Sequence, residues 1–112
     1  MVIVGTAAEK KLIKKFFKKY SFAVIDACDQ TSLLGLAALM ERLNFYIGGD
    51  SGPLHVASSA DIPLLALMTH ITENFSQPYP PAPFKQIIAK DKMTHITVDE
   101  VFDKIKEMNV ID

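Results

Sequence analysis

The sequence predicts an α/β fold, in which a parallel sheet is flanked by helices. Along residues 2–68, short apolar runs alternate with segments of helical period, and the connections between them are short. The run at residues 63–68 is apolar on both faces, which is typical of a central strand in a parallel sheet. Alternating strands and helices require right-handed crossovers, so the strands lie parallel and helices cover both faces.

Size and composition indicate one globular domain. The chain has 112 residues, of which 49% are hydrophobic and 22% charged, enough apolar surface for a single core. No apolar run approaches the ~20 residues of a membrane span, and the first residues lack the pattern of a secretory signal. The single cysteine, Cys28, excludes an internal disulfide, and no Cys/His cluster has zinc-site spacing. We therefore expect a cytoplasmic protein.

The first predicted strand is residues 2–5, an apolar run that ends at Gly5. A helix over residues 7–19 follows, because its apolar residues recur at helical spacing. The same helix carries six lysines arranged as i, i+4 pairs, a pattern typical of one solvated face. Attraction to anionic lipopolysaccharide or a membrane surface is the alternative. Nucleic acid is not expected as a partner, whereas an exposed apolar stripe on this helix would favour self-association.

The middle of the chain repeats the pattern. Residues 22–26 form the second predicted strand, and residues 32–43, with leucines and alanines at helical period, form a helix capped by Thr31 or Ser32. The third strand is residues 45–49, the third helix residues 52–60 and the fourth strand residues 63–68.

The last third departs from this regular alternation. Residues 69–84 contain four prolines and no sustained period, which predicts an irregular loop. Residues 86–89 are expected to form a short edge strand. Residues 98–108 predict an amphipathic helix with Thr97 as its N-cap and acids in its first turn. The isolated His70 and His95 are expected at the surface.

The most informative segment is residues 48–55, which joins the third strand to the third helix. Gly48 and Gly49 permit positive φ and leave no Cβ in the way of a ligand, Ser51 can cap the helix, and Pro53 suits its first turn. The backbone N–H groups of Ser51, Gly52, Leu54 and His55 then converge with the helix dipole, which favours a phosphate or diphosphate. The alternative is a tight turn without a ligand. Neither GxGxxG nor GxxxxGK[ST] is present.

Residues 33–60 resemble the C-terminal half of glycosyltransferase family 9, the ADP-heptose:lipopolysaccharide heptosyltransferases. The family signature D-[ST]-G-x-x-H-x-A-A is matched by Asp50, Ser51, Gly52, His55 and Ala57, with Ser58 where a second alanine is usual. The broader likeness covers residues 2–68 and resumes over the terminal helix. It implies a Rossmann-like domain, the nucleotide-sugar-binding half of a two-domain GT-B enzyme.

The resemblance also implies a function and a set of site residues. The family transfers heptose from ADP-heptose to the lipopolysaccharide core with inversion, and needs no metal or cofactor because backbone amides and a helix dipole stabilise the leaving diphosphate. The implied nucleotide-sugar ligands in this sequence are Gly49, Asp50, Ser51, Gly52, His55, Glu9 for the ribose, and Thr31 with Ser32 beside the adenine. Glu9 as a plain first-turn acid, and His55 bonded within the protein, remain alternatives.

The sequence departs from the family in two places. The family's Gly-Pro-[ST]-x-Pro loop after the fourth strand reads Met68-Thr-His-Ile-Thr72 here, and the domain's own first strand is absent. The catalytic base, an aspartate, belongs to the N-terminal acceptor domain, so no catalytic residue is expected in residues 1–112. We therefore expect a fragment, inactive alone. The alternatives are a standalone nucleotide- or phosphate-binding module and a degenerate remnant that binds nothing.

Overall fold

The computed structural model of the chain describes residues 2–3, 25–27, 32–49, 52–79 and 81–109. The chain divides into two compact units, Met1–Leu36 and Ala37–Asp112, and each is described by itself. Within the described ranges, every helix is too short or too polar to cross a bilayer.

The first unit contains one parallel strand pair. Strand β1 (Val2–Ile3) pairs with β2 (Ile25–Asp26), with Val2 opposite Ile25. Both strands fall inside predicted ones, so these two predictions are confirmed over the described residues. The predicted helix at residues 7–19 lies outside the described residues, as do Glu9 and Thr31.

Helix α2 (Leu33–Glu41) begins in the first unit and ends in the second. The Oγ of Ser32 accepts a hydrogen bond from the backbone N–H of Gly35 at 3.0 Å, as an N-cap does. The prediction of a cap at this position is therefore confirmed for Ser32. Met40, near the end of the helix, is fully buried.

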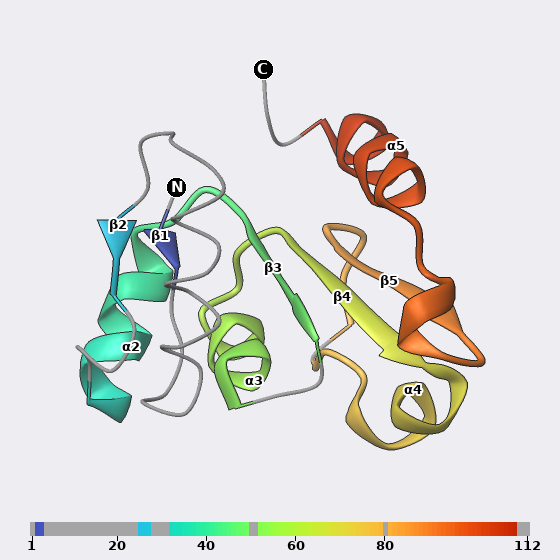
Figure 1. The fold of residues 1–112 in the computed structure, drawn as a ribbon. Coiled ribbons are helices and arrows are strands. Elements are labelled where there is room, and N and C mark those ends of the chain that lie inside the picture. Colours follow the sequence, from blue (N-terminus) through green and yellow to red (C-terminus); the bar gives the residue numbers. More distant parts are fainter. Residues whose placement is uncertain (1, 4–24, 28–31, 50–51, 80, 110–112) are drawn as a thin grey trace. The chain divides into compact units, whose positions relative to one another are not determined.

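The second unit is built on a three-stranded parallel sheet in the order β3 (Tyr46–Gly49), β4 (Leu64–Thr69), β5 (Lys85–Lys90). Its strands run side by side in Figure 1. Four of the six residues of β4 are buried, on both faces of the strand. This confirms the prediction of a central strand at residues 63–68 and of an edge strand at residues 86–89. The α/β class with parallel strands is confirmed with them.

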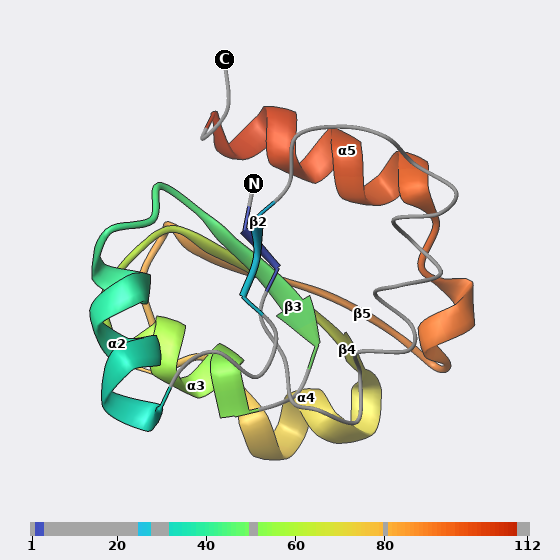
Figure 2. The same ribbon diagram turned by 60° about the vertical axis from the view of Figure 1, so that its left-hand side comes forward.

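Helices lie on both sides of this sheet (Figure 2). Helix α3 (Gly52–Ser59) follows β3 and buries Leu54 and Ala57. On the other side, the 3-10 turn η2 (Met93–His95) and helix α5 (Val98–Met108) follow β5. The Lys90 ammonium at the end of β5 is 2.6 Å from the Glu100 carboxylate in the first turn of α5. Helix α5 has the predicted bounds, and its predicted cap is a capping box between Thr97 and Glu100.

The irregular loop expected at residues 69–84 is wrong over its first half, where the structure has helix α4 (His70–Ser76). Thr69 is its N-cap: the Thr69 Oγ1 accepts from the Thr72 N–H at 3.2 Å, and the Thr69 N–H donates to the Thr72 Oγ1 at 3.0 Å. The four prolines begin only at Pro78, after the helix has ended. They stop the helix, but they do not prevent it.

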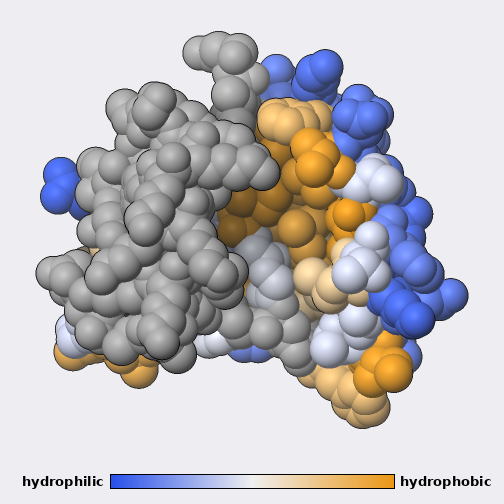
Figure 3. Space-filling model, in the orientation of Figure 1, coloured by the Kyte–Doolittle hydropathy of each residue, from blue (hydrophilic) through white to orange (hydrophobic). Residues whose placement is uncertain are grey.

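Apolar side chains remain exposed on the outer helices of the second unit. On α4 and the loop after it they are Ile71, Phe75 and Tyr79, and on α5 they are Val98 and Phe102. Figure 3 shows hydrophobic surface over α4, at the lower right, and beside α5. A solvent-facing helix surface is usually polar, so these residues need an explanation.

Candidate nucleotide-sugar site

The candidate site lies at the carboxyl edge of the three-stranded sheet. Because the strands are parallel, β3 ends at Gly49, β4 at Thr69 and β5 at Lys90 along the same edge. Helix α3 begins at Gly52, three residues after the end of β3. Open α/β sheets bind ligands outside the carboxyl ends of their strands. The turn singled out from the sequence therefore occupies the edge where a ligand is expected.

The two glycines before the turn do not have the conformation that was expected. Both belong to β3, and no glycine among the described residues has positive φ. A Cβ on Gly48 would lie 2.8 Å from the Cζ atom of Tyr46, whose ring is buried. A Cβ on Gly49 would have only ordinary contacts, the nearest at 3.5 Å from the Leu67 carbonyl oxygen. Gly48 thus makes room for the Tyr46 ring, a role that the local sequence did not indicate.

The start of α3 is open beside its first residue. Gly52 is the first residue of the helix, and a Cβ added there would meet no atom within 4 Å. The first turn contains no acidic residue, so no carboxylate in it competes with an anion for the positive end of the helix dipole. Pro53 lies in this first turn, as predicted. His55 follows in the same helix and is exposed.

Three of the predicted ligands lie in described elements: Gly49 is the last residue of β3, and Gly52 and His55 are in the first turns of α3. The other predicted ligands lie outside the described residues: Glu9, Thr31, Asp50 and Ser51. Their roles stay predictions.

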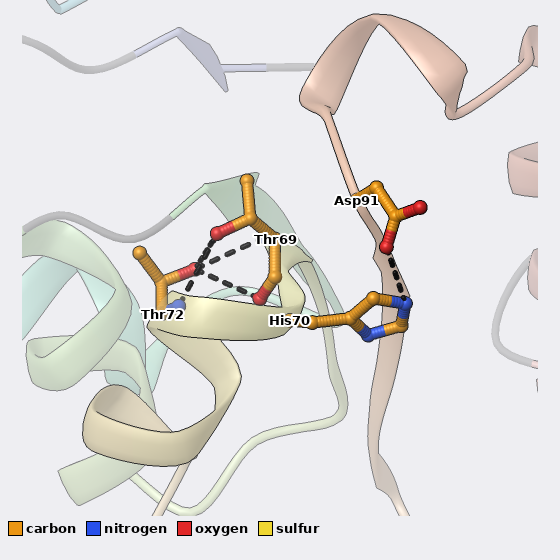
Figure 4. A network of polar contacts seen from close by, with 4 residues as sticks. All are labelled: Thr69, His70, Thr72 and Asp91. Carbon is orange, nitrogen blue, oxygen red and sulfur yellow. Dashed lines mark hydrogen bonds and ion pairs between the residues drawn. The ribbon is translucent and has the colours of Figure 1, made fainter.

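A second polar cluster, which the sequence analysis missed, lies at the same edge where β4 ends (Figure 4). Besides the Thr69–Thr72 capping box, the His70 Nε2 is 3.5 Å from an Asp91 carboxylate oxygen, and both side chains are exposed. The prediction that His70 and His95 lie at the surface is confirmed. The threonine hydroxyls already hold the backbone of α4. The signal in the sequence was the pair of threonines three residues apart at the end of an apolar strand.

At the other end of α3, a buried cluster fixes the helix against the strands. The Ser58 Oγ donates to the carbonyl oxygen of Tyr79 and accepts from the Tyr79 N–H, both at 2.8 Å. The Lys85 ammonium, whose side chain is 1% exposed, donates to the Ser58 carbonyl at 3.1 Å and lies 3.4 Å from the Asp61 carboxylate. Asp61 has φ of 61°. Ser58 is the residue that departs from the family signature, and its hydroxyl anchors the proline-containing loop.

Two further features lie away from the turn. A pocket of about 210 Å³ is lined by Pro83, Phe84, Gln86, Lys104, Glu107 and Met108. These residues lie just before β5, at its amino end and in the last turns of α5, so the pocket is not at the carboxyl edge. In the part of the chain that the structure describes, no three His, Cys, Asp or Glu side chains are grouped as ligands for a metal ion.

Comparison with known proteins identifies the family. Residues 1–102 match the family model described as glycosyltransferase family 9 (heptosyltransferase). The chain belongs to glycosyltransferase family 9. The matched range includes the segment between β3 and α3, helix α3 and the whole three-stranded sheet. A search of curated proteins finds no match.

A solved structure supports the same assignment. It is described as the glycosyl transferase family 9 from Veillonella parvula DSM 2008, and is similar with a TM-score of 0.68 and 26% sequence identity. The similarity covers 99% of the present chain and 29% of that chain. The family-9 chain described here therefore spans less than a third of the length of this solved relative.

Proposed function

We propose that this chain is the donor-binding domain of an inverting glycosyltransferase that transfers heptose from ADP-heptose to the lipopolysaccharide core. The observation that carries the proposal is the position of the signature: in the sequence it begins directly after Gly49, where β3 ends, and its residues 52–57 form the first turns of α3. This is where an α/β sheet meets its ligand and where a helix stabilises an anion.

In the proposed complex the diphosphate of the donor lies against the turn. Gly52 supports this, because the space beside it is open and the first turn of α3 has no acid. Backbone N–H groups there donate to phosphate oxygens, and Gly49 and His55 flank them. Asp50 binds sugar hydroxyls, Glu9 the ribose, and Thr31 the adenine. These assignments follow the family pattern and the predicted positions of the residues.

In the proposed reaction the acceptor hydroxyl attacks the anomeric carbon of the heptose from the side opposite the diphosphate. The bond between that carbon and the diphosphate oxygen breaks, and ADP leaves with the electron pair. The turn acts at this step, because preorganised N–H groups and a helix dipole stabilise negative charge as it develops on the leaving group. The hydroxyl proton goes to a base in a separate acceptor domain, so we expect this chain alone to bind donor without transferring sugar.

Calorimetric titration with ADP, UDP and inorganic phosphate tests the proposal. We expect the chain to bind ADP at millimolar concentration or tighter. In the Gly52→Asp variant we expect ADP to bind at least about fivefold more weakly, because a carboxylate about 4 Å from a phosphate costs between ~1 and ~4 kcal/mol, depending on the local dielectric. The open space beside Gly52 lets the fold accept the side chain.

The matched control is Ser59→Asp, which adds the same charge to an exposed position at the other end of α3. Affinity for ADP should not change in this variant. Equal loss of affinity in the two variants would show that the charge acts at long range and not at the turn. No heat with any of the three ligands would refute the proposal and support the degenerate remnant.

A further inference from the structure

Two exposed polar side chains face each other where β4 and β5 end (Figure 4). His70 follows Thr69, the last residue of β4, and Asp91 follows Lys90, the last residue of β5. The His70 Nε2 lies 3.5 Å from an Asp91 carboxylate oxygen, and the two side chains are 59% and 84% exposed. This contact is longer than a good N–H···O hydrogen bond, which is about 2.9–3.0 Å. Both groups therefore keep hydrogen-bonding capacity for a ligand.

The turn η2, which follows β5, connects this pair to the end of β3. The Met93 Cε lies 3.9 Å from the position of a Cβ added to Gly49, the last residue of β3. Asp91 is only two residues before Met93, and two residues span at most about 7 Å. The Met93 side chain is 45% exposed. The pair and the start of the signature turn thus border the same stretch of the carboxyl edge, and a partly exposed thioether links them.

The chemistry of this pair suits neutral hydroxyl groups better than a second phosphate. A carboxylate accepts hydrogen bonds, and an imidazole donates from at least one ring nitrogen. A hydroxyl group both donates and accepts, so it can satisfy Asp91 and His70 together. A phosphate would meet the negative charge of Asp91, which is unfavourable. The thioether of Met93 is polarizable and adaptable, and it suits the C–H groups of a sugar ring.

We propose that His70 and Asp91 bind hydroxyl groups of the donor sugar, in addition to Asp50. This inference rests on the proposed function, which places the diphosphate at the start of α3. In that function Glu9 and Thr31, which belong to the first compact unit, hold the ribose and the adenine. The sugar at the other end of the diphosphate is then the part of the donor that the second unit receives. Convergent polar groups of this kind fix the orientation of a ligand.

Calorimetric titration of the intact chain with ADP and with ADP-heptose separates contacts to the sugar from contacts to the nucleotide. His70→Ala and Asp91→Asn should each weaken the binding of ADP-heptose about three- to tenfold, as one lost hydrogen bond does, and leave the affinity for ADP within about twofold. Both positions are exposed, so neither change should unfold the chain. The matched control is His95→Ala at an exposed histidine of η2, which should change neither affinity.

The outcomes separate this inference from the proposed function. If ADP does not bind, the proposed function is refuted, and this inference falls with it. If ADP binds but both variants bind ADP-heptose as tightly as the wild type, only this inference is overturned. It is also overturned if the wild type binds ADP and not ADP-heptose, or if the variants lose affinity equally for the two ligands. An equal loss in His95→Ala has the same meaning, because the effect is then not specific to the pair.

Discussion

Replacing Ser58 by alanine removes both hydrogen bonds that hold the backbone of Tyr79. Each of the two contacts is 2.8 Å long, and Ser58 itself is buried. A net contribution of about 0.5–1.5 kcal/mol per bond gives roughly 1–3 kcal/mol. The higher helix propensity of alanine returns about 0.5 kcal/mol. We therefore expect the free energy of unfolding to fall by about 1.5 kcal/mol, although alanine is what the family signature places here.

Thermal unfolding and hydrogen exchange measure this change. At this chain length a loss of 1.5 kcal/mol lowers the melting temperature by about 6 °C. Exchange of the Tyr79 amide should accelerate about tenfold, because its acceptor is the Ser58 hydroxyl.

Ser59→Ala is the natural control, since Ser59 is exposed and its hydroxyl donates to the Val56 carbonyl within the same helix. This control should change stability by less than about 0.5 kcal/mol. If the two alanine variants melt at the same temperature and the Tyr79 amide exchanges as before, the two hydrogen bonds between Ser58 and Tyr79 contribute nothing to stability and the reasoning is wrong.

Two more predictions follow from single residues. Hydrogen bonds from the Lys90 ammonium and then from the Thr97 backbone lower the pKa of Glu100 from 4.5 to about 2. The ionised Glu100 carboxylate therefore stabilises the folded state fully above pH ~4.5, and this contribution is lost as the pH falls toward ~2. In melting curves recorded from pH 2 to 6, the melting temperature of Glu100→Gln should fall less at acid pH than that of the wild type. Gly48→Ala should lower the free energy of unfolding by about 1–3 kcal/mol, because its Cβ strikes the Tyr46 ring. In denaturant titrations of both variants, Gly52→Ala should leave the free energy of unfolding unchanged, since a Cβ there meets no atom within 4 Å. A similar loss in both variants would show that the Tyr46 contact is not the cause.

The sequence was sufficient for elements whose pattern is local. The apolar run at residues 63–68 predicted the central strand, since a parallel sheet excludes water from both faces of its middle strand. Thr97, with acids in the following turn and a 3.6-residue apolar period, predicted α5 and its cap. The signature at residues 50–57 located the candidate site, because its residues are consecutive.

Sequence reasoning failed where a competing local signal or a distant neighbour decided the result. The prolines at residues 78–83 suggested a loop from Thr69 onward, but the Thr69–Thr72 capping box starts a helix before the first of them. The sequence interpretation of Gly48 was that glycine is needed there to permit a positive φ. Its role depends on Tyr46, whose ring occupies the space that a side chain would fill.

The sequence by itself determined the α/β class, the order of the described elements apart from α4, and the turn where an anion is expected. Periodicity and caps act between residues a few positions apart, so they can be read along the chain. Only the tertiary structure decided which residues from distant parts of the sequence contact one another. The Lys85 contact with Ser58 and the hold of Ser58 on Tyr79 join residues more than 20 positions apart. Such contacts depend on strand register and helix packing, which no local pattern specifies.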